Sequence, residues 1–173
     1  PQYHDMGLIG SYLGLLYCAG SGYYMSPLSF LQRPMMWIEA VSKYNATHLQ
    51  APNFAFKLTA KKSSNSSVDN LDLSTVRHVI NAAEPVTEDS INAFHQAFDK
   101  YGFQDVIFPT YGLAEHTVFV CSGGNQRLTV DKLQLETNGN VVILDDSTQN
   151  DTTSRLIGCG YPSSQGVDVR IVD

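Results

Sequence analysis

The sequence has few basic residues. Its 173 residues hold 11 Lys and Arg against 17 Asp and Glu, which gives a formal net charge of -6. Lys61-Lys62 is the only basic doublet, so the clustered positive charge that nucleic acids attract is missing. Long apolar runs are missing too, since none approaches the about 18 residues that a membrane-spanning helix needs. The sequence therefore predicts neither a nucleic-acid surface nor a membrane span.

Cysteine is also scarce, and the three cysteines, Cys18, Cys121 and Cys159, lie far apart without C-x-x-C spacing. Neither a disulfide framework nor a zinc site is indicated by this pattern. We expect buried free thiols in a reducing compartment, and hence a cytoplasmic protein.

Three familiar motifs of catalysis and nucleotide binding are absent as well. The sequence has no G-x-S-x-G, no G-x-x-x-x-G-K-[ST] and no G-x-G-x-x-G after a strand-like segment. What it does have is 43% hydrophobic residues, which is enough for the core of one compact domain or of one piece of a larger protein.

Strand-like and helix-like segments alternate along residues 1–124. We expect strands over 21–26, 47–52, 76–81, 105–110 and 117–123, and helices over 7–18, about 34–45, 53–62 and 87–102. The helix over 7–18 is expected to be buried because nearly all its residues are apolar. This alternation predicts an α/β fold with a mainly parallel sheet flanked by helices.

The alternation stops after residue 124. Asn138-Gly139 lies between two apolar segments and is typical of a β-hairpin turn that needs positive φ. We therefore predict an α/β part over 1–124, an inserted hairpin with a polar loop over 125–154, and the start of a β-rich subdomain over 155–173. Both ends of the chain lie in strand-like sequence, which suggests a piece of a longer polypeptide.

Polar residues follow three predicted segments, in the loops 4–7, 81–86 and 109–115. Ligands of parallel α/β sheets bind beyond the carboxyl ends of the strands, so these loops predict a common site. Each loop taken alone is equally explained as an ordinary surface turn. The hypothesis of a nucleotide site depends on all three loops meeting.

The residue types in these loops suit a nucleotide. Ala82 and Ala83 leave room for a flat group to approach the backbone, and Tyr111 can offer a ring face to adenine. Gly112 permits a tight turn, and Glu115 can supply a carboxylate oxygen to Mg²⁺.

Six segments resemble those of fatty acyl-AMP ligases, which belong to the adenylate-forming superfamily together with acyl-CoA synthetases. They are PQYHDMGLIG, MSPLSFLQRPMMWIEAVSKY, APNFAF, NAAEPV, PTYGLAEHT and GCGYP followed by VRIVD. HDMGLIG and PNFAF resemble the fatty acyl-AMP ligase branch, whereas Y-G-x-x-E resembles the whole superfamily. The resemblance covers essentially the whole chain.

The resemblance implies a role for each loop. Ala83, Glu84 and Pro85 would line an adenine slot that Tyr111 closes from the other face. The implied ATP- or AMP-binding residues are Ala82, Ala83, Glu84, Pro85, Thr110, Tyr111, Gly112, Leu113 and Ala114. Two residues would be catalytic: Glu115 would hold the Mg²⁺ of ATP, and His4 would lie beside the acyl carboxylate and the α-phosphate. The candidates for lining an acyl tunnel are Met6, Met25, Phe30, Trp37 and Phe54, which would serve equally as core residues.

The implied reaction joins a fatty acid to ATP, giving an acyl-adenylate and pyrophosphate. Its cofactors would be ATP and Mg²⁺, and its partners an acyl carrier protein or polyketide synthase module and the enzyme's own C-terminal small domain. The insertion over 125–154 would restrain that small domain and disfavour transfer to CoA; a purely decorative hairpin is the alternative.

Two departures and several missing groups qualify the resemblance. The family more often has Gly where Ala82 stands and a smaller residue where His116 stands. The phosphate loop would precede Pro1, and the ribose-binding aspartate and the catalytic lysine would follow Asp173, so this chain alone is expected to be inactive. An acyl-CoA synthetase and a non-catalytic, adenylation-like binding module remain alternative readings.

Overall fold

The computed structural model describes residues 2–64, 70–148, 150–162 and 166–172. The sequence of segment 63–70, SSNSSVDN, predicts a polar loop, and its residues 65–69 lie outside the described ones. The helical elements are η1 (Met6–Leu13), α1 (Gly14–Cys18), α2 (Pro27–Gln32), α3 (Met35–Tyr44), α4 (Asn53–Ser63), α5 (Glu88–Phe98), η2 (Asp99–Tyr101), η3 (Ala114–His116) and α6 (Lys132–Asn138). The strands are β1 (His48–Pro52), β2 (His78–Ala82), β3 (Ile107–Pro109), β4 (Tyr111–Gly112), β5 (Phe119–Cys121), β6 (Arg127–Asp131) and β7 (Thr153–Ile157).

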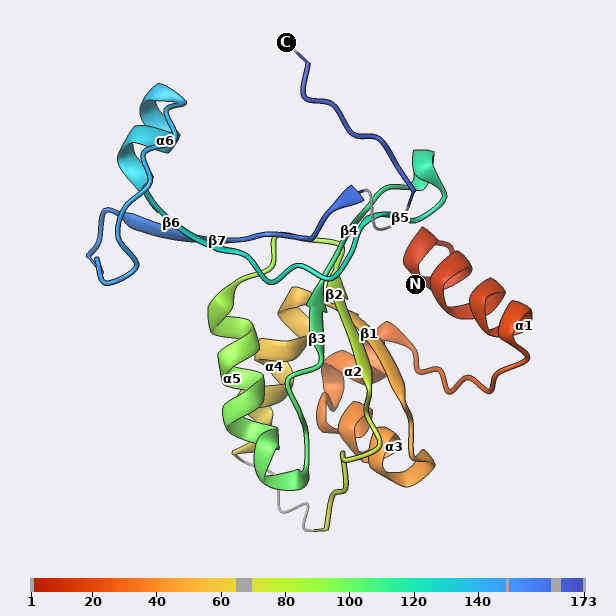
Figure 1. The fold of residues 1–173 in the computed structure, drawn as a ribbon. Helices are drawn as coiled ribbons and strands as arrows, with labels where there is room; N and C mark the ends of the chain where they lie inside the picture. The colour runs from red at the N-terminus through yellow and green to blue at the C-terminus, as the bar shows by residue number, and fades with distance from the viewer. Residues whose placement is uncertain (1, 65–69, 149, 163–165, 173) are drawn as a thin grey trace.

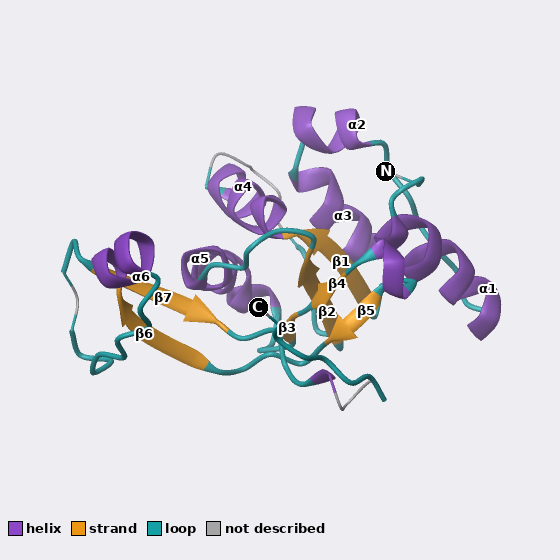
Figure 2. Cartoon of the chain, turned by 90° about the horizontal axis from the view of Figure 1, so that it is seen from above, coloured by secondary structure: helices purple, strands orange, loops and turns teal. Residues whose placement is uncertain are grey.

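The centre of the fold is a parallel sheet in which β2 lies between β1 and β3. The chain passes through α4 between β1 and β2, and through α5 between β2 and β3. Because such crossovers are right-handed, both helices lie on the same face of the sheet, as Figures 1 and 2 show. The η1–α1 segment lies on the opposite side. The α/β fold with a parallel sheet and flanking helices is thus confirmed.

Aromatic side chains fill the space between the helices. Phe94 of α5 is fully buried, and its ring centroid lies 5.2 Å from that of Phe56 and 4.6 Å from that of Phe98. Trp37 of α3 joins the same cluster at 5.5 Å from Phe56. Trp37 also lies 5.9 Å from Phe94 itself. The apolar faces of α3 and α5, both expected from their 3.6-residue spacing, therefore face the core.

The other face of the sheet carries a row of rings. His78 lies between His48 and Phe108, at centroid distances of 5.8 Å and 4.6 Å. Burial, and then the neighbouring His48, lower the pKa of His78, so its ring stays neutral at neutral pH. This agrees with a packing role for a histidine inside a strand.

Two expectations for the first 26 residues are wrong. The apolar run over 7–18 is helical, as η1 and α1, but none of its residues is buried, and Tyr17 is 93% exposed. Residues 21–26 form no strand. Tyr23 stacks on Tyr44 at 3.8 Å and Tyr24 on Tyr12 at 4.5 Å, so these rings pack on other rings instead of joining a sheet.

The predicted hairpin at Asn138-Gly139 is also wrong. Gly139 does have positive φ, at 66°, but it caps the C-terminus of helix α6. The antiparallel pairing lies further out, between β6 and β7, which enclose α6. Arg155 of β7 forms an ion pair of 2.8 Å with Glu88. The ribbon formed by β6, α6 and β7 is therefore attached to the N-terminal end of α5. Among the described residues beyond β7, strand pairing is limited to the Ser122–Tyr161 bridge.

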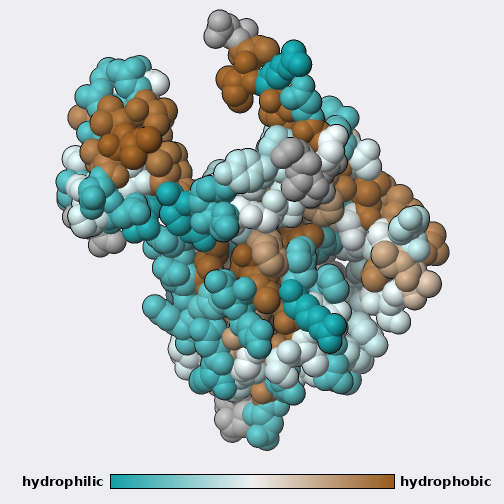
Figure 3. Space-filling view, viewed as in Figure 1, coloured by the Kyte–Doolittle hydropathy of each residue, from teal (hydrophilic) through white to brown (hydrophobic). Residues whose placement is uncertain are grey.

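Exposed apolar side chains gather away from the sheet. Figure 3 shows them over α6, the C-terminal stretch and the N-terminal helices; on and after α6 they include Leu133, Val141, Val142 and Ile143. The cysteines are free, as expected, but Cys18 is exposed and the other two are half-buried, so the expectation of buried thiols is wrong. No helix in the described ranges has the length and apolar character needed to cross a bilayer.

Replacing Phe94 by alanine should lower the free energy of unfolding by about 3–5 kcal/mol. The substitution leaves a cavity among four aromatic side chains, those of Trp37, Phe56, Phe98 and Phe103. Urea denaturation of the purified protein measures this loss. Leu133→Ala is the control, since Leu133 is 61% exposed and its truncation should change the free energy by less than about 0.5 kcal/mol. Equal losses for the two variants would contradict the described core.

Candidate functional site

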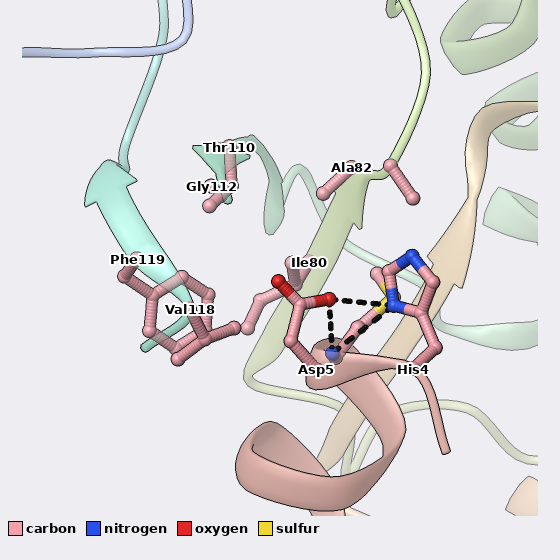
Figure 4. Close-up of a pocket in the computed structure, with 10 residues that line it drawn as sticks. His4, Asp5, Ile80, Ala82, Thr110, Gly112, Val118 and Phe119 are labelled. Atoms are coloured by element: carbon pink, nitrogen blue, oxygen red, sulfur yellow. Dashed lines mark hydrogen bonds and ion pairs between the residues drawn. The ribbon is translucent and has the colours of Figure 1, made fainter. Parts of the chain in front are cut away.

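The three loops meet at one pocket beside the carboxyl end of β2 (Figure 4). The described residues that line it are His4, Asp5, Met6, Ile80, Ala82, Ala83, Thr110, Gly112, Val118 and Phe119. Parallel pairing is the reason, because β2 and β3 end at the same edge of the sheet and η1 begins beside it. The convergence expected from the sequence is therefore present.

His4 and Asp5 line the pocket from the turn that leads into η1. The Asp5 carboxylate accepts the backbone N–H of Met6 at 2.7 Å and lies 2.6 Å from Nδ1 of His4. The same Met6 N–H also donates to Nδ1 of His4 at 3.2 Å, so Nδ1 is engaged within this turn. The loop is tied to the sheet, since Gln50 of β1 donates to the Met6 carbonyl at 2.9 Å.

Two alanines form the ledge at the end of β2. Ala83 adopts a left-handed backbone conformation with φ of 69°, which is uncommon for a residue other than glycine. Ala82, where the family more often has glycine, is not among the residues with positive φ. The next residue, Glu84, accepts the backbone N–H of Phe54 at 2.5 Å. Its carboxylate is therefore held at the N-terminal end of α4.

Gly112 is required by a close approach of two strands. A Cβ added there would lie 1.8 Å from the backbone carbonyl of Val118, so any side chain would force β4 and β5 apart. That carbonyl accepts the N–H of Leu113 at 3.0 Å. Thr110 attaches the same loop to β2, because its N–H donates to the Asn81 carbonyl at 3.0 Å.

Tyr111 and Glu115 lie on this loop but outside the wall of the pocket. Tyr111 is 49% exposed and lies opposite Cys121 in the β4–β5 pair. Glu115, in the turn η3, is exposed and has neither a hydrogen bond nor an ion pair to any residue that the structure describes. Glu84, Pro85, Leu113 and Ala114 are likewise not part of the wall.

Glu115 suits a magnesium ion that arrives with a ligand of its own. Its carboxylate oxygens are not engaged, and Mg²⁺ in such sites takes one or two carboxylates together with substrate phosphates. No group of three or more His, Cys, Asp or Glu side chains able to hold a metal occurs in the described part of the chain. The residues present therefore fit a nucleotide-bound ion better than a metal centre built by protein alone.

The candidate acyl-binding residues fall into three places. Phe30, Trp37 and Phe54 form one aromatic cluster, with Phe30 at 6.2 Å from Trp37 and 6.3 Å from Phe54. Trp37 packs against the core, whereas Phe54 is 46% exposed. Met6 lines the pocket, and Met25 is half-buried in the segment before α2. Phe54 is the member of the cluster whose backbone N–H donates to Glu84, in the loop after the alanine ledge.

Sequence reasoning missed four residues of the wall, namely Asp5, Ile80, Val118 and Phe119. Asp5 stands inside a loop that was singled out, so only its role was missed. Val118 and Phe119 follow the Y-G turn, and a signal for them was available, since a glycine in a two-strand turn often marks the close approach of another backbone.

Comparison with known proteins agrees with this geometry. The whole chain, residues 1–173, matches the AMP-binding enzyme family. It is 35% identical to the medium-chain-fatty-acid–[acyl-carrier-protein] ligase JamA of Moorena producens, over all of this chain and 30% of that protein. It is 34% identical to TtuA of Teredinibacter turnerae, a ligase of the same description, over 92% of this chain and 25% of that protein.

A solved structure is similar as well. It is the fatty acyl-adenylate ligase from L. pneumophila in complex with acyl adenylate and pyrophosphate, with a TM-score of 0.82 and 37% identity. The match covers 92% of this chain and 28% of that one, so the chain spans less than a third of each relative. With its full length matched by one family and its pocket formed by the expected loops, the chain belongs to the AMP-binding enzymes and resembles their fatty acyl-AMP ligases.

Proposed function

We propose that this chain is the adenine- and acyl-binding part of a ligase that activates a fatty acid with ATP and passes it to an acyl carrier protein. The observation that carries the proposal is the meeting of His4, the Ala82–Ala83 ledge and the Thr110–Gly112 turn at one pocket. The printed descriptions of JamA and TtuA support the choice of fatty acid and carrier protein. We place the enzyme in the cytoplasm because its described cysteines are free.

In the proposed reaction, a carboxylate oxygen of the fatty acid attacks the α-phosphorus of ATP. A new O–P bond forms, the bond to the bridging oxygen breaks, and pyrophosphate leaves with the electron pair. His4, whose Nδ1 accepts the Met6 N–H, would carry its proton on Nε2 and donate it as a hydrogen bond to the oxygens where the carboxylate and the α-phosphate meet. Charge grows on the phosphoryl oxygens, so positioning and electrostatic stabilisation supply most of the catalysis.

The nucleotide would occupy the ledge and the turn. The backbone of Ala82 to Pro85 offers a flat surface to adenine, and Tyr111 stacks on the opposite face. Thr110, Gly112, Leu113 and Ala114 complete the turn that holds the ring of Tyr111. Glu115 would hold Mg²⁺, which when bound supplies positive charge to the ATP phosphates.

The acyl chain would extend from Met6 toward Phe54 and Phe30, with Met25 and Trp37 behind them. Aromatic and methionine side chains adapt to a flexible alkyl chain. The ribbon formed by β6, α6 and β7 would favour the carrier protein over CoA by restraining a C-terminal small domain. A polyketide synthase module is the proposed destination of the acyl group.

The proposal is tested with the whole enzyme, a medium-chain fatty acid and ATP, supplied with either CoA or a phosphopantetheinylated acyl carrier protein. We expect pyrophosphate and acyl-adenylate, followed by acyl transfer to the carrier protein. Abundant acyl-CoA would identify an acyl-CoA synthetase instead. Nucleotide binding without release of pyrophosphate would identify a non-catalytic binding module.

Glu115→Gln should reduce the adenylation rate by about 100-fold or more, because an amide does not replace the charge of a carboxylate ligand. The rate of pyrophosphate release measures the loss. Asp105→Asn is the matched control: it removes one negative charge from a side chain that is 93% exposed and should leave the rate unchanged. A Glu115→Gln enzyme with the wild-type rate would remove Glu115 from the mechanism.

Tyr111→Ala should raise the apparent KM for ATP by about tenfold, since base–aromatic stacking contributes about 1–3 kcal/mol. Tyr111→Phe retains the ring and should keep the wild-type KM. Tyr17→Ala, at a ring that is 93% exposed on α1, controls for the loss of a surface tyrosine. An unchanged KM for ATP in Tyr111→Ala would contradict stacking.

A further inference from the structure

Asn53, the first residue of α4, is a buried polar residue outside the pocket wall. Its Oδ1 accepts hydrogen bonds from Nδ2 of Asn81 and from the backbone N–H of Thr87, each at 3.2 Å. It also accepts one from the hydroxyl of Ser90. Nδ2 of Asn53 donates to Oγ1 of Thr87 at 3.3 Å. One side chain thus connects the end of β2, the loop after it and the first turn of α5.

The Asn81 side chain, which β2 contributes to this network, has no second hydrogen-bond partner among the described atoms. Asn81 is fully buried, and its Oδ1 has no hydrogen-bond partner among the described atoms. The bond from its Nδ2 to Asn53 is therefore the side chain's link to its surroundings. Loss of Asn53 would leave the Asn81 amide and the Thr87 N–H without their acceptor, and an unsatisfied buried donor costs about 1–3 kcal/mol.

The next residue of α4 holds the middle of the same loop. The backbone N–H of Phe54 is one of the N-terminal donors that a helix leaves free, and Glu84 accepts it at 2.5 Å. The first two residues of α4 therefore contact segment 81–87 at three positions, Asn81, Glu84 and Thr87. Between the first two of these lies Ala83 with its φ of 69°, a conformation that persists only where the surroundings fix it.

We propose that Asn53 is a positioning residue for nucleotide binding: it fixes the shape of loop 82–86 through Asn81 and Thr87. It is buried beside α5 and is not among the residues that line the pocket. The proposal rests on the proposed function, because it requires loop 82–86 to receive adenine. Beyond that function, it assigns to Asn53 an effect on ATP binding that is exerted through the shape of loop 82–86.

This role differs from a purely structural one in what it does to kinetics. A loop that is only partly in the binding-competent shape weakens the apparent affinity for ATP by the populated fraction, whereas saturating ATP restores the shape. Asn53→Ala should therefore raise the KM for ATP by about tenfold and change kcat by less than about twofold. A merely destabilising substitution would lower the amount of active enzyme and leave the KM unchanged.

The experiment measures pyrophosphate release by the whole enzyme against ATP concentration for four proteins besides wild type. Asn53→Ala removes the side chain, and Asn53→Ser, which keeps a polar group but is too short to reach Asn81 and Thr87, covers the case in which the alanine variant does not fold. Asn53→Asp keeps the accepting oxygens and should return the KM for ATP to within about threefold of wild type. Thr59→Val is the matched control, since Thr59 is fully buried on the same helix and its hydroxyl has no partner among the described atoms; its KM should be that of wild type.

A higher KM for ATP in a folded Asn53→Ala or Asn53→Ser enzyme, with rescue by Asn53→Asp, supports the proposal. If the folded variants keep the wild-type KM, or if Thr59→Val shifts it equally, Asn53 is only a stabilising residue and the proposal fails while the proposed function stands. If the wild-type enzyme neither binds ATP nor releases pyrophosphate, both fail together.

Discussion

Parallel pairing of β2 with its two neighbours brings the loops after β2 and β3 to one edge of the sheet, and the rest of the candidate site is built against that edge. Asn81 lies opposite Ala51 of β1 and Pro109 of β3, so the loops after β2 and β3 start at the same level. Side chains alternate between the two faces of a strand. Asn81 therefore points into the helical layer, where Asn53 binds it, and Ala82 lies at the pocket. Two successive residues of β2 thus contribute one contact that holds the loop and one side chain to the wall of the pocket.

Close backbone packing accounts for the residue types on which the nucleotide hypothesis was based. Gly112 is needed because the Val118 carbonyl occupies the space of a side chain. Ala83 combines positive φ with a small Cβ, in a loop that the start of α4 holds on both sides. The small residues in these loops are therefore required by the backbone packing itself. The open surface that adenine would use results from the same small side chains.

Local patterns predicted helices and strands well where one face of the element is buried and the other is wet. The stripe of Ile91, Phe94 and Phe98 is an example, because its spacing alone defines the buried face. Residues 7–18 are apolar on all sides, so their pattern does not define which face of the helix is buried. Whether they are buried at all depends on the elements that pack around them. The Asn138-Gly139 pair is compatible with two structures, because a residue with positive φ occurs both in hairpin turns and at helix C-caps. The overlooked discriminator was Asp131, whose carboxylate caps α6 through the N–H of Gln134 at 2.9 Å.

The same distinction explains which site residues the sequence could indicate. His4, Ala83 and Gly112 stand in loops at the ends of strands, and chain order alone identifies such loops. Asn53 begins a helix on a crossover, where an asparagine reads as an ordinary helix start. Its importance comes from contacts with residues 28 to 37 positions away, which only the folded chain brings together. Residues that would touch a ligand are thus easier to infer from sequence, because they share a position in loops that follow strands. Residues that hold those loops in place, such as Asn53, have no common sequence pattern and are identified by their contacts in the folded chain.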